Sequence, residues 1–164
     1  MKKLTTIMLA GLLVLTSAMM FGCGSGSGSG DKAADKGPQP FTLGEYTYLP
    51  EKITRAADAD TDSAEGYTVS LLIEGDTAPI IISNGVTRAG VEMSLVSGDT
   101  ELNFKTAGFS VLEDKEKVDQ YGARAAFTFE IPKGSDFPEK AIASGGDNWS
   151  EKAEFSLADL PREE

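Results

Sequence analysis

Four acidic side chains crowd one short stretch of the sequence: Asp58, Asp60, Asp62 and Glu65. Alternating aspartates of this kind open the oxygen-ligand loops that bind Ca²⁺. The stretch departs from the EF-hand pattern, because Ser63 stands where that loop has Gly and Val69 where it has a bidentate Glu. Two interpretations remain: a weak Ca²⁺ site, and a solvated acidic loop whose Asp and Ser residues favour turns. We favour the solvated loop.

A second polar stretch, SGGDNWS, spans residues 144–150. Its two glycines free the backbone beside three candidate ligand-binding residues, Asp147, Asn148 and Trp149. A sugar ring could stack on the indole while the neighbouring polar groups bind its hydroxyls. The alternative, which we favour, is a hairpin loop whose Trp149 folds back onto the end of the domain.

The sequence contains no histidine and only one cysteine. Without histidine, Ser-His-Asp and Cys-His catalysis lack their general base. The common zinc, copper and haem sites lack their usual ligands. With 26 Asp and Glu against 15 Lys and Arg, a net charge of −11, the chain is not expected to bind nucleic acid. What remains is glycoside hydrolysis by two carboxylates, or recognition without catalysis. We expect no cofactor other than the weak Ca²⁺ site.

The lone cysteine closes an N-terminal segment of three parts. Lys2 and Lys3 precede an uncharged apolar run over residues 4–21, which Gly22 and Cys23 follow. This is the layout of a secretory signal, which is removed from the mature protein. The Gly-Ser run after Cys23 lacks the Lys and Arg cluster that flanks a membrane-spanning segment.

The end of this segment, Met20-Phe21-Gly22-Cys23, resembles the signal of bacterial lipoproteins. The resemblance implies removal of residues 1–22 and lipidation of Cys23, which would anchor the protein at the extracytoplasmic face of the cell membrane. Ordinary secretion with cleavage after Ala18 and an uncleaved anchor are the alternatives. Residues 23–40 are expected to form a flexible, lipid-anchored tether. Both a Gram-positive surface and an outer membrane remain open.

Alternation of apolar and polar residues predicts strands throughout residues 41–164, which we take as one domain. About seven to nine short antiparallel strands in two facing sheets would make this an all-β sandwich. The expected strands are 41–48, 51–57, 67–74, 79–83, 91–97, 102–106, 108–112, 123–131 and 153–157. The side chains expected to face inward are Tyr67, Val69, Leu71, Ile73, Val91, Met93, Leu95, Leu102, Phe104, Thr106, Ala123, Ala125, Phe127, Phe129, Ile131, Ala153, Phe155 and Leu157.

Three positions carry more detailed expectations. The SGDT stretch at 97–100 predicts the turn of a hairpin. Gly44 stands where the alternation slips phase, as a β-bulge would cause. Residues 112–122 are short and highly charged, and they predict one or two helical turns or an ordered loop between strands.

The C-terminal half, from FTFEIP onward, resembles the closing strands of immunoglobulin-like (telokin-like) domains of bacterial lipoproteins. The matching residues are Gly122, Phe127, Phe129, Ile131 and Pro132. The resemblance implies an immunoglobulin-like sandwich, a fold that does not specify an activity. We expect a non-catalytic binding or assembly module of the bacterial cell envelope, held by lipidated Cys23, with a protein or glycan partner. The alternatives are a small carbohydrate-active enzyme using paired carboxylates and, less suited to this length, a ligand-binding subunit of a transporter.

Overall fold

A computed structural model describes residues 37–83, 86–146 and 149–164 of the chain, with the backbone alone for residues 80–83 and 86–89. This part contains twelve strands and two short 3-10 turns, and no α-helix. The predicted all-β sandwich is confirmed. The predicted count of seven to nine strands is too low, because the alternation does not reveal β5 (Val86–Ala89), β10 (Lys140–Gly145) or β12 (Arg162–Glu163).

The larger sheet has six strands. Its order is β1-β2-β3-β9-β8, and β12 pairs with β2 in parallel while the other neighbours are antiparallel. The remaining strands of this sheet are β1 (Phe41–Leu43), β2 (Tyr46–Arg55), β3 (Ala64–Glu74), β8 (Thr106–Val111) and β9 (Tyr121–Pro132). The longest pairing joins β3 to β9, from Ala64 opposite Pro132 to Glu74 opposite Tyr121.

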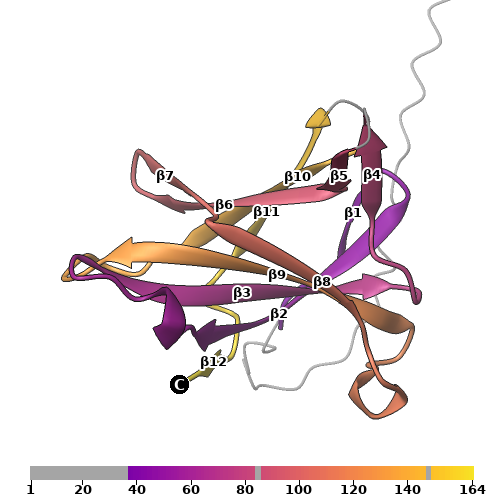
Figure 1. The fold of residues 1–164 in the computed structure, drawn as a ribbon, viewed down its shortest axis with the longest axis horizontal. Helices are drawn as coiled ribbons and strands as arrows, with labels where there is room; N and C mark the ends of the chain where they lie inside the picture. Colours follow the sequence, from indigo (N-terminus) through magenta and orange to yellow (C-terminus); the bar gives the residue numbers. More distant parts are fainter. Residues whose placement is uncertain (1–36, 84–85, 147–148) are drawn as a thin grey trace, which may run out of the picture. The chain divides into compact units, whose positions relative to one another are not determined.

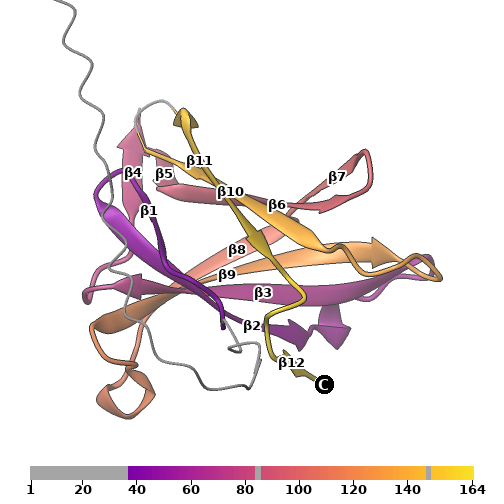
Figure 2. The ribbon, with the colours of Figure 1, turned by 180° about the vertical axis from the view of Figure 1, so that it is seen from behind.

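The smaller sheet has four strands in the order β11-β10-β6-β7, all antiparallel. Its other strands are β6 (Val91–Ser97), β7 (Thr100–Asn103) and β11 (Glu151–Ser156). Figures 1 and 2 show the two sheets as facing layers, with a separate ribbon formed by β4 (Ile80–Ser83) and β5. The predicted hairpin turn between β6 and β7 is confirmed, since Ser97 pairs with Thr100.

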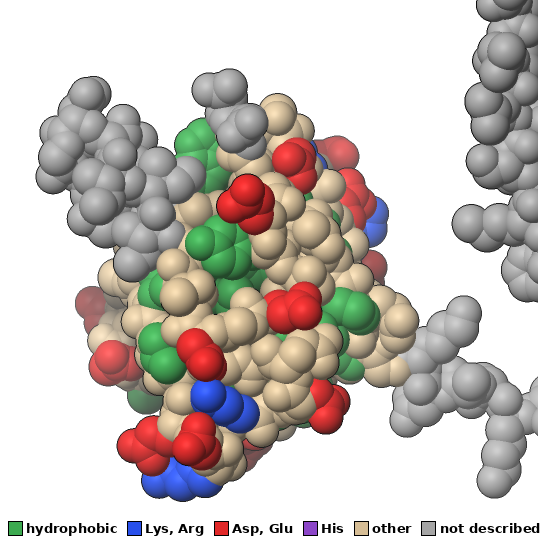
Figure 3. All heavy atoms as spheres, turned by 90° about the vertical axis from the view of Figure 1, so that its right-hand side faces the viewer, with side chains coloured by type: hydrophobic (Ala, Val, Ile, Leu, Met, Phe, Trp, Pro, Cys, Tyr) green, Lys and Arg blue, Asp and Glu red, His purple; other side chains and the backbone are tan. Residues whose placement is uncertain are grey.

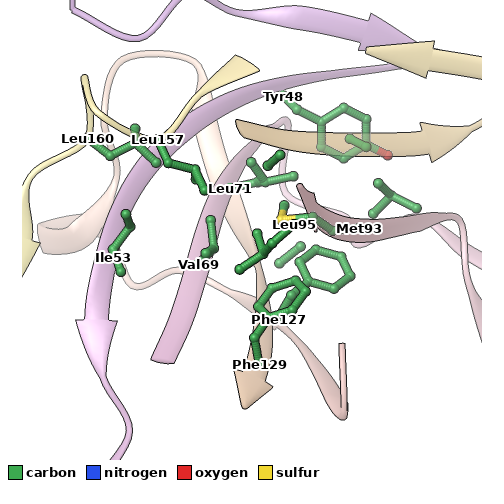
Figure 4. Close-up of a cluster of buried hydrophobic side chains, with 14 of the residues drawn as sticks. Tyr48, Ile53, Val69, Leu71, Met93, Leu95, Phe127, Phe129, Leu157 and Leu160 are labelled. Carbon is green, nitrogen blue, oxygen red and sulfur yellow. The ribbon is translucent and has the colours of Figure 1, made fainter. Parts of the chain in front are cut away.

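The inner faces of the two sheets supply the hydrophobic core, part of which is drawn in Figure 4. The predicted alternation is confirmed for β3, β6 and β9, whose inward side chains are buried. These buried side chains include Val69, Leu71, Ile73, Val91, Met93, Leu95, Ala123, Ala125, Phe127, Phe129 and Ile131. Leu157 is also buried, whereas Tyr67, Leu102, Phe104, Ala153 and Phe155 are partly buried against the cluster. The expectation for Thr106 is wrong, since it begins β8 with an exposed side chain.

Two local expectations need correction. Gly44 does not form a bulge; Leu43 pairs with Tyr46, so Gly44 lies in a two-residue hairpin turn, where its φ of 60° suits glycine. The alternation that turns Val69 and Leu71 inward predicts Ser70 on the solvent face, but Ser70 is buried in β3, which lies between β2 and β9.

The connection between β8 and β9 covers part of the outer face of the large sheet. It contains one 3-10 turn, Asp114–Glu116, which confirms the expected short helical turn. Leu112 and Tyr121 at its ends pack with Leu72 of β3 in a second buried cluster. This connection explains why Leu72 is buried although its neighbours Leu71 and Ile73 point to the opposite face.

The Tyr48 hydroxyl is a polar group inside the core. The Tyr48 side chain is fully buried, and among the described residues its hydroxyl has no hydrogen-bond partner. Burial raises the pKa of this phenol well above its usual value, and the nearby Tyr46 adds to the effect. The ring itself is well packed, with its centroid 5.5 Å from that of Phe41.

Candidate functional site

Strand β8 forms one border of the large sheet, and its outer side has no neighbour among the described strands. It pairs with β9 alone, from Thr106 opposite Thr128 to Val111 opposite Ala123. Figures 1 and 2 show β8 at the side of β9. A border strand presents unpaired N–H and C=O groups to any chain that comes beside it.

The hydrogen bonds between β8 and β9 determine which backbone groups face outward. The Leu112 N–H donates to the Gly122 carbonyl at 2.7 Å. In an antiparallel pair, residues bonded to the partner strand alternate with residues whose N–H and C=O point away from it. With the register of β8 on β9, the outward groups belong to Ala107, Phe109 and Val111.

The same three residues make this border apolar, and we refer to them as the β8 edge. Their side chains lie on the core side of the sheet, opposite buried residues of β9. Phe109 reaches the core, with its ring centroid 6.2 Å from that of Phe127. Ala107 is exposed, and Val111 is 60% exposed. The border therefore offers backbone groups and apolar side chains together.

The other borders of the six-stranded and four-stranded sheets are shorter than β8 or carry charged residues. Edge strands of natural proteins are commonly short or carry charged residues. Strand β11 carries Glu151, Lys152 and Glu154, β7 has four residues including Glu101, and β1 has three residues. Strand β8 has six residues, TAGFSV, with neither a charge nor a proline. Figure 3 shows another face of the molecule, on which acidic side chains separate small hydrophobic areas.

The acidic stretch between β2 and β3 places one carboxylate in an ion pair. The Arg55 guanidinium donates to both carboxylate oxygens of Asp60, at 2.6 and 2.7 Å. The Gly66 N–H also donates to Asp60 Oδ1, at 2.8 Å. These hydrogen bonds, the one from Arg55 first, lower the pKa of Asp60 from 3.8 to about 2. Asp58 is exposed in the 3-10 turn Ala57–Ala59.

The other acids of this stretch do not converge with Asp60. Glu65 accepts a hydrogen bond from the Tyr67 hydroxyl at 2.8 Å. Lys133 Nζ donates to the carbonyl oxygens of Thr61 and Asp62 at 2.9 and 3.3 Å, and so occupies backbone oxygens that a Ca²⁺ ion would need. Within the described ranges, no three acidic or cysteine side chains group closely enough to hold a metal ion.

Of the second polar stretch, Asp147 and Asn148 lie outside the described residues, as does Cys23. Trp149 is half-buried, and its φ of 59° is in the left-handed region that few non-glycine residues adopt. Nearby, the Glu151 carboxylate accepts the Gly44 N–H at 2.8 Å. This bond joins the first residue of β11 to the turn between β1 and β2.

A hollow of about 550 Å³ lies at the surface of β10 and β11. Glu139 and Glu154 both line it, and both are exposed. Lys140 Nζ lies 3.7 Å from a Glu154 oxygen. Hydrolysis of a glycoside by two carboxylates needs a cleft that encloses the sugar and excludes bulk water. This hollow is open to solvent and so offers little support for that chemistry.

Sequence reasoning predicted most of β8 as a strand but did not identify it as a border. The available signal was the uncharged run TAGFSVL, residues 106–112, in a chain in which 25% of residues are charged. It also missed the ion pair between Arg124 and Glu51, which is bidentate at 2.7 and 2.6 Å and joins residues 73 positions apart.

Among the residues that are described, no helix has the length and hydropathy needed to cross a membrane. Comparison of the chain with protein-family models, with curated proteins and with solved structures finds no match. Function is therefore inferred from the residues and geometry of this chain.

Proposed function

We propose that this protein is a lipid-anchored lipoprotein of the bacterial cell envelope that acts by binding or assembly and not by catalysis. Acyl chains on Cys23 would hold it at the extracytoplasmic face of the cell membrane. The observation that carries the proposal is the β8 edge, an uncharged border with exposed apolar side chains, whose outward backbone groups face no partner strand among the described residues. Proteins usually protect such borders from other chains, so an open one is expected where pairing is useful.

We also assign the sandwich to the immunoglobulin-like class. In that class one sheet has the strand order A-B-E-D, and the other has G-F-C, extended by C′ in variable-type domains. The orders β2-β3-β9-β8 and β11-β10-β6-β7 correspond to these strand by strand when β2 is taken as strand A. The assignment supports the fold class implied by the sequence resemblance and leaves the partner open.

The mode of binding that suits this border is β-augmentation, in which an extended segment joins the sheet as a new strand. Backbone hydrogen bonds would supply affinity, and Phe109 and Val111 would select the side chains that fit beside them. A protein partner suits the β8 edge better than a glycan, because a glycan has no peptide groups to pair with the strand.

The anchor is tested by substituting Cys23→Ala in the full chain. We expect the variant to leave the membrane, or to remain there as an uncleaved precursor without acyl groups. Metabolic labelling with a radioactive fatty acid measures this directly. If the wild-type chain takes up no label, the anchor is wrong.

The binding role is tested by the size of the native complex of the full chain, fixed in its membranes by brief formaldehyde treatment before detergent extraction. Val111→Lys places a charge on the β8 edge, and we expect it to reduce the complex to the mass of a single chain. Val118→Lys is the matched control, because Val118 is also exposed (44%) but lies outside β8. A wild-type chain that already migrates alone, or equal effects of both substitutions, would contradict the proposal.

A further inference from the structure

We propose that the occupant of the β8 edge is the β8 edge of a second copy of this chain, with the two strands antiparallel. The inference rests on the proposed binding function and names its partner. It follows from the self-complementarity of β8 in hydrogen bonds, in side chains and in charge.

The hydrogen bonds select one register. The outward backbone groups belong to Ala107, Phe109 and Val111, which are evenly spaced at every second residue. When Phe109 faces Phe109 of the second copy, Ala107 faces Val111 and Val111 faces Ala107. Every outward residue then forms a hydrogen-bonded pair that exchanges two N–H···O bonds. Sliding either strand by two residues leaves part of this set unpaired.

The side chains agree with the same register. Directly opposed residues of an antiparallel pair point to the same face of the sheet. The two Phe109 rings would therefore lie side by side on the core face. Each exposed Val111 would gain the methyl group of an Ala107 as a neighbour, and the two large sheets would become one continuous sheet.

Charges at the two ends of β8 are opposite in sign. Lys105 precedes the strand and Glu113 follows it shortly after its end. In the register centred on Phe109, the end of each β8 that follows Lys105 lies near the end of the second copy that precedes Glu113. Both side chains are exposed and already lie near opposite charges, Glu130 at 3.3 Å and Lys115 at 2.8 Å. Exposed pairs add little affinity, so their role is to favour the antiparallel direction over a parallel one.

The contact is small for a dimer in dilute solution. Strand β8 has six residues, whereas a standard interface uses roughly 20–30 residues from each partner. Anchoring both copies in one membrane raises their effective concentration and compensates for weak pairwise affinity. Self-pairing is therefore expected at the membrane, and to be much weaker for dilute chains in detergent.

The test is disulfide formation between full chains in their native membranes under mild oxidation. Phe109→Cys should give a dimer of doubled mass, because Cα atoms of a hydrogen-bonded pair lie about 5.5 Å apart, within disulfide range. Because Phe109 also contacts the core, a second arm avoids it: differently tagged chains carrying Ala107→Cys and Val111→Cys should crosslink with each other. Neither of these two variants should crosslink with itself, since its own copies are separated by roughly 13 Å along the strand.

Two controls accompany these variants. The parent chain, whose lone thiol is Cys23, should give no dimer if that thiol is acylated. Val118→Cys places an exposed thiol outside β8 and reports random collision. The expected result is dimers from Phe109→Cys and from the mixed chains, at least fivefold above the Val118→Cys level.

The outcomes separate this inference from the proposed function. A larger native complex that Val111→Lys abolishes, without disulfide dimers in either arm, would overturn self-pairing and leave the binding function standing with another partner. A wild-type chain of single-chain mass without crosslinks would overturn both. Self-crosslinking of Ala107→Cys, or equal crosslinking of Val118→Cys, would overturn the antiparallel register proposed here.

Discussion

Replacing Tyr48 with Phe should make the domain more stable, although it removes a polar group from a fully buried position. The hydroxyl has no hydrogen-bond partner among the described residues, so folding strips it of water without compensation. A buried group left unsatisfied costs about 1–3 kcal/mol. The ring, stacked at 5.5 Å on Phe41, is unchanged by the substitution. After allowing a few tenths of a kcal/mol for the contacts of the lost oxygen, we expect a gain of about 1–2 kcal/mol.

Tyr67→Phe is the matched control, because it removes the same atom from a different setting. The Tyr67 hydroxyl donates to Glu65 at 2.8 Å in a partly buried position. Losing this hydrogen bond should cost about 0.5–1.5 kcal/mol. The two substitutions should therefore change stability in opposite directions.

Urea denaturation at neutral pH measures both variants against the parent chain. A second readout is alkaline pH. Because burial raises the pKa of Tyr48 above 10.0, the folded state keeps this proton after the unfolded state has lost it, so stability falls as pH rises past 10. Tyr48→Phe should reduce that fall. If Tyr48→Phe instead destabilises the domain by more than about 1 kcal/mol, the hydroxyl is satisfied and the reasoning is refuted.

Four further predictions concern stability. Phe129→Ala should lower the free energy of unfolding by about 3–5 kcal/mol, because the side chain is fully buried. Thr128→Ala, on the opposite face of the strand, should lower it by less than about 1 kcal/mol. Equal losses in chemical denaturation would refute the assignment of Phe129 to the buried face. Gly66→Ala should cost about 1–3 kcal/mol of stability, because the added Cβ would clash with the Ala56 carbonyl oxygen and lie 2.6 Å from the Ala59 Cβ. Gly108→Ala is the control, since a Cβ there meets open space and should change the melting temperature little. Because the pKa of Asp60 is lowered to about 2, stability should fall as pH drops from 3.8 towards 2, and Asp60→Asn should flatten this fall. Millimolar Ca²⁺ should not shift the melting temperature, and a rise that Asp60→Asn abolishes would restore the calcium interpretation.

The local pattern predicted those parts of the fold that depend on one strand at a time. The alternation around Phe127 and Phe129 identifies the buried face of β9, because side chains of a strand alternate between its two faces. It fails at Leu72, which points away from the core and is nonetheless buried by Leu112 and Tyr121. Those residues lie at the ends of a connection that is 40 to 49 positions further along, which no short window of sequence contains.

The candidate site was predictable to a smaller degree. The acidic stretch was visible as a cluster, but the pairing of Asp60 with Arg55 depends on the backbone path of the loop. Likewise, the run that forms β8 was read as a strand, whereas its position at a border depends on the order in which distant strands pair. Properties set by strand order are properties of the whole chain, so a local pattern does not reveal them.

The short strand β1 has a mechanical consequence. It is joined to β2 by three residue pairs, and the Phe41 ring stacks on Tyr48 and Phe155. A pull applied ahead of Phe41 would open this hairpin from its free end, breaking one pair at a time, while the eleven pairs between β3 and β9 stay in place. Strand β1 would thus be the first part of the domain to unfold under load. Its opening would lengthen the proposed tether by a few residues before the sandwich itself unfolds.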